Sequence, residues 1–192
     1  IDSPYLYQVR TQLIQQGRIL DEVLTPAGFR TQSFDPDKGF FLNGRPLKLK
    51  GVCIHQDHAG VGVAVPPGLL EYRLHRLKEL GCNAIRCSHN AQDKAFYALC
   101  DRMGFLVMDE NRVFNPSPIH MAELEWLVRR DRNHPSIILW SVFNEEPMQG
   151  TEQGYQMVRR MVAKVKSLDT TRPVTAALND GLFTPVTVSQ AV

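Results

Sequence analysis

The pattern of apolar and polar positions along the chain changes once, near residue 47. Before that point, short stretches of partly alternating apolar and polar residues are separated by turn dipeptides, which is typical of β-hairpins. The first predicted hairpin pairs 5–13 with 18–23 across the turn dipeptide Gln16-Gly17. The second pairs 40–42 with 46–50 across Asn43-Gly44. Residues 1–46 are therefore predicted to be all-β, with a linker-like turn cluster at 35–39.

After residue 47, short apolar strands alternate with amphipathic helices, a rhythm typical of βα units and a parallel sheet. The predicted strands are 49–54, 84–87, 105–108, 137–142 and 174–178. The helices predicted between them are 69–80, 95–103, 121–132 and 157–168. Their apolar stripes are explained by core packing and require no cofactor. Residues 47–192 are therefore predicted to form a second domain of the α/β class.

Five βα-type units are compatible with two architectures, a doubly wound sheet and the first part of an eight-stranded barrel, which typically needs about 250 residues. Periodicity does not distinguish them. No strand is followed by G-x-G-x-x-G or by G-x-x-x-x-G-K-[ST], so the sequence offers no phosphate-binding loop. This absence favours the barrel.

The composition is that of a globular protein and points to neither a nucleic-acid nor a membrane partner. The chain has 192 residues, of which 43% are apolar and 22% charged, as is ordinary for a globular protein. Its 22 basic and 20 acidic residues are interspersed, so no nucleic-acid partner is expected. No apolar run approaches the roughly 18 residues of a membrane span, so no membrane partner is expected either. The four cysteines lack C-x-x-C spacing and are predicted to be buried free thiols.

The chain begins at Ile1 rather than at methionine and is expected to be an excised piece of a longer protein. A signal peptide would then lie upstream. A cytoplasmic location is favoured, and a secreted or periplasmic one stays open.

Polar side chains gather just after four of the predicted strands. The residues are His55, Gln56, Asp57 and His58; Ser88, His89 and Asn90, with Arg86 inside the strand; Asp109, Glu110, Asn111 and Arg112; and Asn144, Glu145 and Glu146. The carboxyl ends of parallel strands converge on one face, and clustered charges there cost desolvation free energy unless they are paired. The four groups therefore predict one polar pocket.

Three kinds of chemistry compete for this pocket. Strand alternation places Cys53, His55 and Asp57 on one face, with His58 adjacent, but no second ligand pair follows at the spacing of a zinc finger, so polar or sugar contacts are preferred to zinc. A serine nucleophile would need an elbow such as G-x-S-x-G, which is absent. Carboxylate chemistry remains. A glutamate at the end of a buried strand, between apolar walls, would have its pKa raised by desolvation and could act as a general acid.

Four motifs resemble glycoside hydrolase family 2, and the resemblance covers essentially the whole chain. They are GVCIHQDH at 51–58, NAIRCSHN at 83–90, CDRMGFLVMDEN at 100–111 and RDRNHPSIILWSVFNEEP at 130–147. The resemblance implies that residues 1–46 are the end of an immunoglobulin-like β-sandwich and linker. It implies that residues 47–192 are the first five βα units of a (β/α)8 TIM barrel, here truncated.

The resemblance also implies a retaining β-glycosidase with Glu145 as general acid/base. By the same resemblance, Asn144 contacts the sugar 2-hydroxyl and Arg86 orients the acid/base region. The further residues expected to contact the sugar are His55, His89, Asp57, Asn90 and Asp109.

The mechanism needs a second carboxyl group about 5–5.5 Å from the first. Adjacent residues of an extended chain face opposite ways, so Glu145 and Glu146 cannot form this pair. The resemblance places the nucleophilic glutamate on the seventh barrel strand, beyond Val192, and the chain alone is expected to be inactive.

The substrate is expected to be a glycoside or oligosaccharide with a terminal β-linked sugar. A β-galactoside is favoured, and a β-glucuronide, a β-mannoside or a role as a non-catalytic carbohydrate-binding remnant remain alternatives. Homo-oligomerisation of a full-length protein stays open. Family members that bind magnesium have an acidic residue and a histidine where this chain has Asn111-Arg112-Val113-Phe114, so neither magnesium nor another cofactor is expected.

Overall fold

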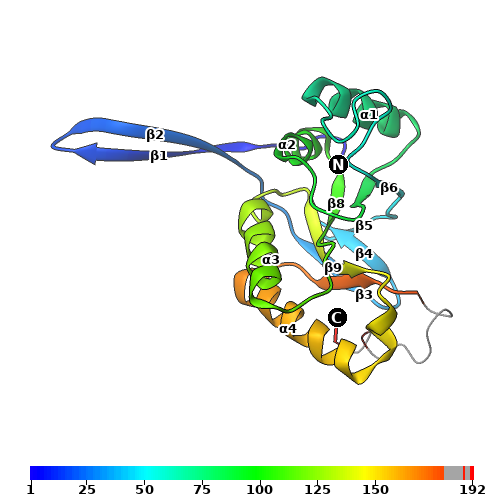
Figure 1. Cartoon of the computed structure of the whole chain (residues 1–192). Helices are drawn as coiled ribbons and strands as arrows, with labels where there is room; N and C mark the ends of the chain where they lie inside the picture. The colour runs from blue at the N-terminus through cyan, green and yellow to red at the C-terminus, as the bar shows by residue number, and fades with distance from the viewer. Residues whose placement is uncertain (180–187, 189–190) are drawn as a thin grey trace.

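A five-stranded parallel sheet forms the centre of the structure, a computed structural model that describes residues 1–179, 188 and 191–192 (Figure 1). Its strands are β6 (Gly51–Ile54), β7 (Ala84–Cys87), β8 (Leu106–Glu110), β9 (Ile137–Asn144) and β10 (Val174–Ala177). The strands lie side by side in chain order, and each neighbouring pair is parallel. A doubly wound sheet would reverse its strand order at a switch point. The observed order therefore confirms the prediction of the first part of a barrel.

Four helices connect these strands. They are α1 (Pro67–Glu79), α2 (Lys94–Met103), α3 (Pro118–Asp131) and α4 (Glu152–Leu168), and a short 3-10 helix, η1 (Pro147–Gly150), precedes α4. The sequence predicted all four helices but placed the starts of α1, α3 and α4 too late. In α1 and α3 the first turn contains a proline, which is pre-organised for a helix start without adding to the apolar stripe. Among the described residues, no helix is long and apolar enough to cross a membrane.

Alternation along the strands gives the sheet two faces. Ile85, Cys87 and Val107 belong to the main apolar core, which they share with buried residues of the helices. Arg86, between Ile85 and Cys87, and Glu110, an odd number of residues from Val107, lie on the opposite face, which corresponds to the barrel interior. The barrel-facing side of the sheet therefore carries the polar side chains.

A small antiparallel sheet covers the N-terminal ends of the central strands. It consists of β3 (Gln32–Asp35), β4 (Gly39–Leu42) and β5 (Arg45–Pro46). Phe40 of this sheet packs against Leu106 and Ile138, which lie near the starts of β8 and β9. The predicted strand 46–50 is wrong beyond Pro46, because Leu47 and Leu49 pack into this second apolar cluster instead of extending the hairpin.

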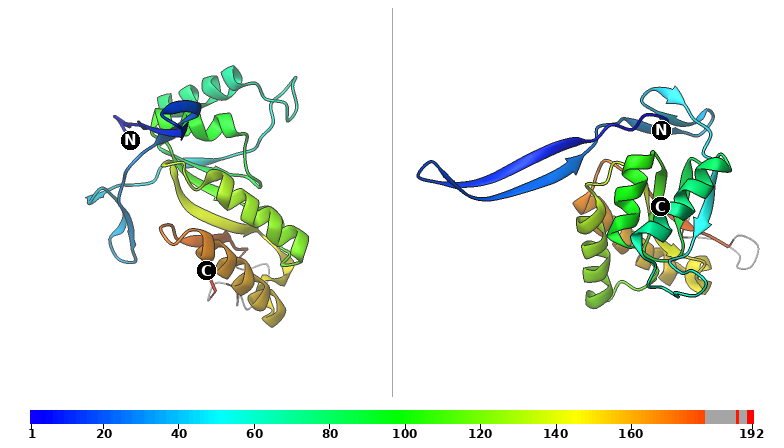
Figure 2. Two further views of the ribbon diagram at one scale, coloured as in Figure 1. Left: turned by 90° about the vertical axis from the view of Figure 1, so that its left-hand side faces the viewer. Right: turned by 90° about the horizontal axis from the view of Figure 1, so that it is seen from above.

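A long hairpin projects from the body of the molecule (Figures 1 and 2). It consists of β1 (Tyr7–Gln15) and β2 (Arg18–Ala27), joined by Gln16 and Gly17, which have φ angles of 48° and 77°. Positive φ at both central residues is the geometry of a tight hairpin turn. Leu13 and Ile14 are more than half exposed, as are Ile19 and Leu20. Such an apolar hairpin is typical of part of a larger β-structure.

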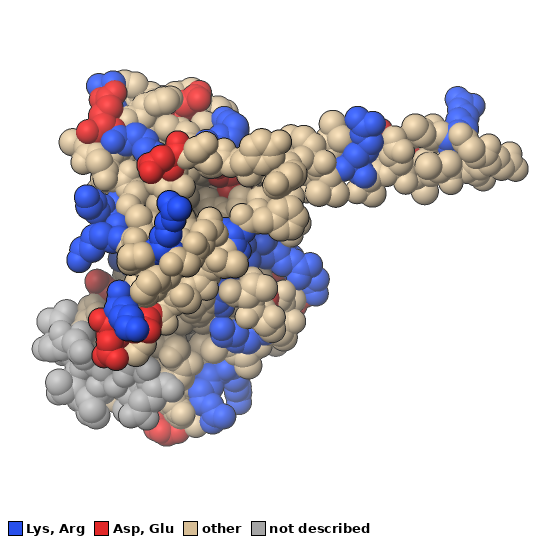
Figure 3. All heavy atoms as spheres, turned by 180° about the vertical axis from the view of Figure 1, so that it is seen from behind, with Lys and Arg blue, Asp and Glu red and all other residues tan. Residues whose placement is uncertain are grey.

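The two predicted hairpins thus lie in separate sheets, one projecting and one packed on the parallel sheet. The domain boundary after residue 46 stays a prediction. Figure 3 shows Lys, Arg, Asp and Glu side chains interspersed on one face of the molecule, in agreement with the mixed charge pattern of the sequence.

The four cysteines are free thiols. Cys87 and Cys100 are buried as predicted, and Cys82 is half-buried. The prediction of burial is wrong for Cys53, which is exposed because β6 is an edge strand of the parallel sheet.

Candidate active site

The carboxylate of Glu110 joins the polar groups at the C-terminal end of the sheet. Glu110 is the last residue of β8, and its side chain is completely buried. The Arg86 guanidinium donates from Nε to Oε2 over 2.9 Å and from Nη2 to Oε1 over 3.0 Å. Two charge-assisted hydrogen bonds of this kind fix the relative orientation of both groups. The sequence placed Glu110 in the polar pocket but assigned it no role.

Two further side chains reach the same carboxylate. His89, in the loop after β7, places Nδ1 2.9 Å from Oε1 of Glu110. Ser141 of β9 donates its hydroxyl to Oε2 over 2.8 Å. The exposed ring of His55 meets the His89 ring edge-on, with 5.1 Å between ring centroids. Glu110 therefore connects β7, β8 and β9 at one point.

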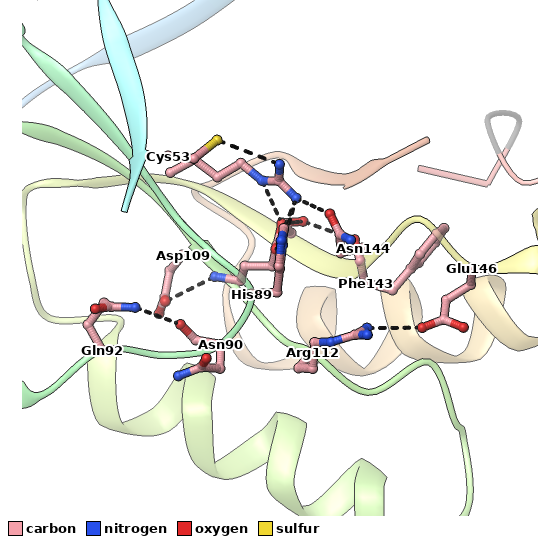
Figure 4. Close-up of polar contacts among 12 residues, drawn as sticks. Cys53, His89, Asn90, Gln92, Asp109, Arg112, Phe143, Asn144 and Glu146 are labelled. Atoms are coloured by element: carbon pink, nitrogen blue, oxygen red, sulfur yellow. Dashed lines mark hydrogen bonds and ion pairs between the residues drawn. The ribbon is translucent and has the colours of Figure 1, made fainter. Parts of the chain in front are cut away.

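Arg86 extends this network to the end of β9. Its Nη2 donates to Oδ1 of Asn144, and its Nη1 lies 3.8 Å from the Cys53 sulfur. Figure 4 shows the side chains of Cys53, His89 and Asn144 directed toward this common centre. Burial acts to lower the pKa of Arg86, but the hydrogen bond and the charge of Glu110 more than offset it, so the pKa is raised. The guanidinium therefore stays charged and keeps Asn144 in place.

Glu145 follows Asn144 directly and leaves the sheet in a left-handed conformation, with a φ of 49°. This conformation is uncommon for residues other than glycine and is found at functional sites. The Glu145 backbone N–H donates to the Ala177 carbonyl of β10 over 2.9 Å, which fixes the turn. The predicted burial of Glu145 between apolar walls is wrong for this chain, because the strand ends at Asn144 and the glutamate is exposed.

Glu146 is held separately from Glu145. Its Oε1 lies 3.1 Å from Nη1 of Arg112, which follows β8. Among the described residues, no group of three His, Cys, Asp or Glu side chains is placed to hold a metal ion, and this includes the candidate zinc ligands Cys53, His55 and Asp57.

Two predicted sugar contacts lie outside the Glu110 network. Asp57 is exposed in the loop after β6, where its backbone carbonyl accepts a hydrogen bond from Arg73 over 2.9 Å. Asn90 is also exposed, and its amide donates to the Ala91 carbonyl over 2.8 Å. Figure 4 shows Asn90 beside Gln92, apart from His89 and Asn144. Contact of Asp57 and Asn90 with a sugar stays a prediction.

Asp109 points away from the network, into the core between β8 and α2. Its side chain is completely buried, and Oδ1 accepts a hydrogen bond of 2.6 Å from the Tyr97 hydroxyl. Burial, and then the nearby charge of Asp131, raise the pKa of Asp109 well above its usual value. Because its side chain has no exposed surface, Asp109 is not among the sugar contacts that we propose.

A partial parallel barrel with its polar network at the C-terminal strand ends has the architecture of a TIM-barrel enzyme, in which active sites lie at that face. The family model for the TIM barrel domain of glycosyl hydrolases family 2 matches residues 36–117 and 115–190. The chain belongs to glycoside hydrolase family 2.

Relatives with two different activities are similar to the chain. The β-galactosidase BoGH2A of Bacteroides ovatus is 39% identical over 94% of the chain and 26% of the relative. A β-glucuronidase of Bacteroides fragilis is 38% identical over 93% of the chain and 28% of the relative. The crystal structure of a family 2 member from Bacteroides cellulosilyticus matches with a TM-score of 0.87 and 41% identity, over 92% of this chain and 25% of that one. The chain thus spans about a quarter of the length of these proteins.

Proposed function

We propose that the complete gene product containing this chain is a retaining glycoside hydrolase in which Glu145 is the general acid/base. The observation that carries this proposal is the position of Glu145, an exposed carboxylate in a fixed left-handed turn, directly after an asparagine that the Arg86–Glu110 pair holds in place. A retaining glycosidase needs such a group to protonate the leaving oxygen and then to deprotonate the attacking water.

The neighbouring residues suit the binding of a sugar. Arg86 donates to the amide oxygen of Asn144, so the amide nitrogen is the part of Asn144 that can donate to a sugar hydroxyl, which we take to be the 2-hydroxyl. The rings of His55 and His89 meet edge-on, and His89 lies against the same Arg86 nitrogen that binds Asn144. Glu146 is held by Arg112 and is not the second carboxyl group of the mechanism. That nucleophile belongs to a segment outside this chain, and residues 1–192 alone are proposed to be inactive.

A neutral sugar is favoured over a uronic acid. In the described part of the site, the guanidinium groups of Arg86 and Arg112 are each paired with a glutamate of this chain. Their charge is therefore already committed and does not call for a substrate carboxylate. A β-galactoside is the proposed substrate, which agrees with the Bacteroides ovatus relative. A β-glucuronide is the second candidate, supported by the β-glucuronidase relatives, including the human enzyme at 36% identity.

Replacing Glu145 with Gln in the complete gene product tests the acid/base assignment. General acid catalysis contributes roughly 10²- to 10⁴-fold, so kcat/KM should fall by that factor on substrates with poor leaving groups. Aryl glycosides with good leaving groups need little protonation and should lose much less. The matched control is Glu146→Gln, which keeps the adjacent acid. Equal, mild losses on both classes of substrate would contradict the assignment.

The sugar assignment needs a separate measurement. Comparing kcat/KM for the same aryl leaving group on β-galactose, β-glucuronic acid and β-mannose should give the largest value for β-galactose. A preference for glucuronic acid would overturn the neutral-sugar proposal and leave Glu145 unaffected. Calorimetric titration of residues 1–192 with galactose, together with an activity assay, tests the carbohydrate-binding alternative, which predicts binding without hydrolysis.

A further inference from the structure

Glu110 is completely buried, and its carboxylate has Arg86, Ser141 and His89 as hydrogen-bonding neighbours. Its two oxygens accept hydrogen bonds from Nε and Nη2 along one edge of the Arg86 guanidinium, and Ser141 donates its hydroxyl. His89 completes the set through Nδ1. An ionised carboxylate can only accept hydrogen bonds. Glu110 therefore dictates which atoms of its neighbours carry protons on the side that faces it.

The consequence for His89 is a defined tautomer. A contact of 2.9 Å between Nδ1 and a carboxylate oxygen requires the proton on Nδ1, since the carboxylate has none to give. Nη2 of Arg86 also lies 3.3 Å from Nδ1, and because both nitrogens are donors, both are directed at the same carboxylate oxygen. A neutral imidazole has one N–H. Nε2 of His89 is therefore left as a hydrogen-bond acceptor.

The consequence for Asn144 is the opposite polarity. Glu110 fixes the guanidinium of Arg86, and Nη2 of Arg86 donates to Oδ1 of Asn144. The amide oxygen is thus committed to the guanidinium, and the amide nitrogen, a donor, faces away from it. One carboxylate sets an acceptor on His89 and a donor on Asn144.

We propose that Glu110 is a positioning residue that sets the hydrogen-bond polarity of the site, so that His89 accepts a hydrogen bond from one sugar hydroxyl and Asn144 donates to another. The sugar part of this inference rests on the proposed glycosidase function. The tautomer part concerns the chain alone, and it can be tested without any substrate. Glu110 itself has no exposed surface and does not touch the sugar.

The first test is the tautomer of His89, read from the ¹⁵N chemical shifts and two-bond couplings of the imidazole rings in residues 1–192. The spectrum is recorded at pH 8, and the His89 signals are assigned by their loss in His89→Gln. Wild-type His89 is expected to be the Nδ1–H tautomer. Finding the Nε2–H tautomer in the wild-type chain would by itself overturn the proposal.

Glu110→Gln provides the second arm. A glutamine offers one acceptor oxygen and one donor NH₂ group to four donors, so the fixed arrangement is lost and His89 should move toward the Nε2–H form that a free imidazole favours. The matched control is Glu123→Gln. Glu123 lies 2.7 Å from Nδ1 of His120 in an exposed pair, so this change should affect His120 only. An unchanged His89 signal in a folded Glu110→Gln chain would contradict the proposal.

The third arm measures kcat/KM of the complete gene product on substrates in which one sugar hydroxyl is replaced by fluorine. A fluorine can accept a hydrogen bond but cannot donate one, so replacing the hydroxyl that donates to His89 should lower kcat/KM by roughly tenfold in the wild type. Glu110→Gln should reduce that penalty at the same sugar position, whereas Glu123→Gln should leave it unchanged. A fluorine penalty equal in wild type and Glu110→Gln would overturn the sugar-reading role even if the tautomer is confirmed. Absence of any hydrolysis would contradict the proposed function and leave the tautomer result standing.

Discussion

Each end of β9 carries a network built on an arginine paired with a carboxylate, and the two arginines have different further partners. At the N-terminal end, Arg172 donates to the backbone carbonyls of Arg132, His134 and Ile137 and pairs with Asp169 over 2.6 Å. At the C-terminal end, the partners of Arg86 are side chains, as described above. One arginine is therefore bound to the backbone itself, whereas the other holds side chains whose remaining atoms are left for a ligand.

This difference explains why one network stabilises the fold and the other serves the site. Backbone carbonyls cannot turn away, so Arg172 fixes the connection between α3 and the start of β9 and leaves few unsatisfied groups. The side chains around Arg86 keep atoms that the network does not use, on His89 and Asn144, beside the exposed Glu145. In TIM barrels the C-terminal face carries activity and the N-terminal face carries stability. We expect the two ends of β9 to divide these roles within one strand.

The largest effect is expected from removing the N-terminal arginine. Arg172→Ala removes the cationic partner of the Asp169 carboxylate, which keeps only its hydrogen bonds from Thr171 and Trp140, and takes a donor away from three backbone carbonyls. Breaking a buried ion pair in this way costs roughly 3–5 kcal/mol in the free energy of unfolding. Urea unfolding of the chain, followed by the fluorescence of the buried Trp140, measures the loss. The control is Arg132→Ala, an exposed arginine that donates one hydrogen bond to the Leu168 carbonyl. A loss below about 1 kcal/mol would contradict the structural role that we assign to Arg172.

The next effect concerns the pH dependence of the same network. Burial acts to raise the pKa of Asp169, but hydrogen bonds from Thr171, Trp140 and Arg172 outweigh it and lower the pKa to about 2. Because the folded pKa lies below the unfolded value, the stabilisation is complete above the unfolded pKa, near about 3.9, and is lost as the pH falls toward 2. Asp169→Asn should therefore cost roughly 1–2 kcal/mol at pH 7 and progressively less below pH 4. If Asp169→Asn cost the same free energy of unfolding from pH 7 to pH 2.5, the carboxylate charge would not be the cause. The control is Asp37→Asn, at an exposed position.

Asp109, beside the C-terminal network, should show the opposite sign. Burial and the charge of Asp131 raise its pKa, so the folded protein keeps a proton that the unfolded chain releases. Its contribution to stability is therefore complete below the unfolded pKa and decreases as the pH rises toward the folded pKa.

Asp109→Asn keeps an acceptor for the Tyr97 hydroxyl, so at pH 4 it should differ from the wild type by less than about 1 kcal/mol. Between pH 4 and pH 7 the stability of Asp109→Asn should rise relative to the wild type. A parallel pH dependence of the two proteins in urea unfolding would contradict a raised pKa of Asp109.

The sequence predicts the two networks to different extents. Apolar runs that end in polar residues identify β7, β8 and β9 and place Arg86, Asn144 and Glu145 at one face of the sheet. The choice between Asp109 and Glu110 is harder, because β8 is buried on both faces and its composition does not show which residues face the barrel. The sequence did offer one signal for choosing Glu110, which is the presence of Arg86 inside an apolar strand. A buried cation requires a carboxylate nearby, and the neighbouring strand is a place to look for it.

The N-terminal network left no comparable signal in the sequence. Arg172 and Asp169 lie in a loop between α4 and β10, and three of the partners of Arg172 are backbone carbonyls of distant residues. Any residue type can present a carbonyl, so the sequence does not identify these contacts. The same reasoning applies to Glu145, whose left-handed turn depends on a hydrogen bond to β10.

The smallest effect is expected from the exposed ion pair between Arg112 and Glu146, where the side chain of Arg112 is 53% exposed. Water screens such a pair, and ordering two long side chains costs entropy, so Arg112→Gln should change the free energy of unfolding by no more than about 0.5 kcal/mol. A double-mutant cycle with Glu146→Gln, measured by urea unfolding at low and high salt, gives the coupling free energy directly. The same cycle on Arg86 and Glu110 should give several times that value, since their carboxylate is fully buried. A coupling above about 1 kcal/mol for Arg112 and Glu146 would mean that this pair also fixes the loop after β9. The C-terminal end of β9 would then be stabilised by its ion pairs much as the N-terminal end is, and the contrast between the two ends would not hold.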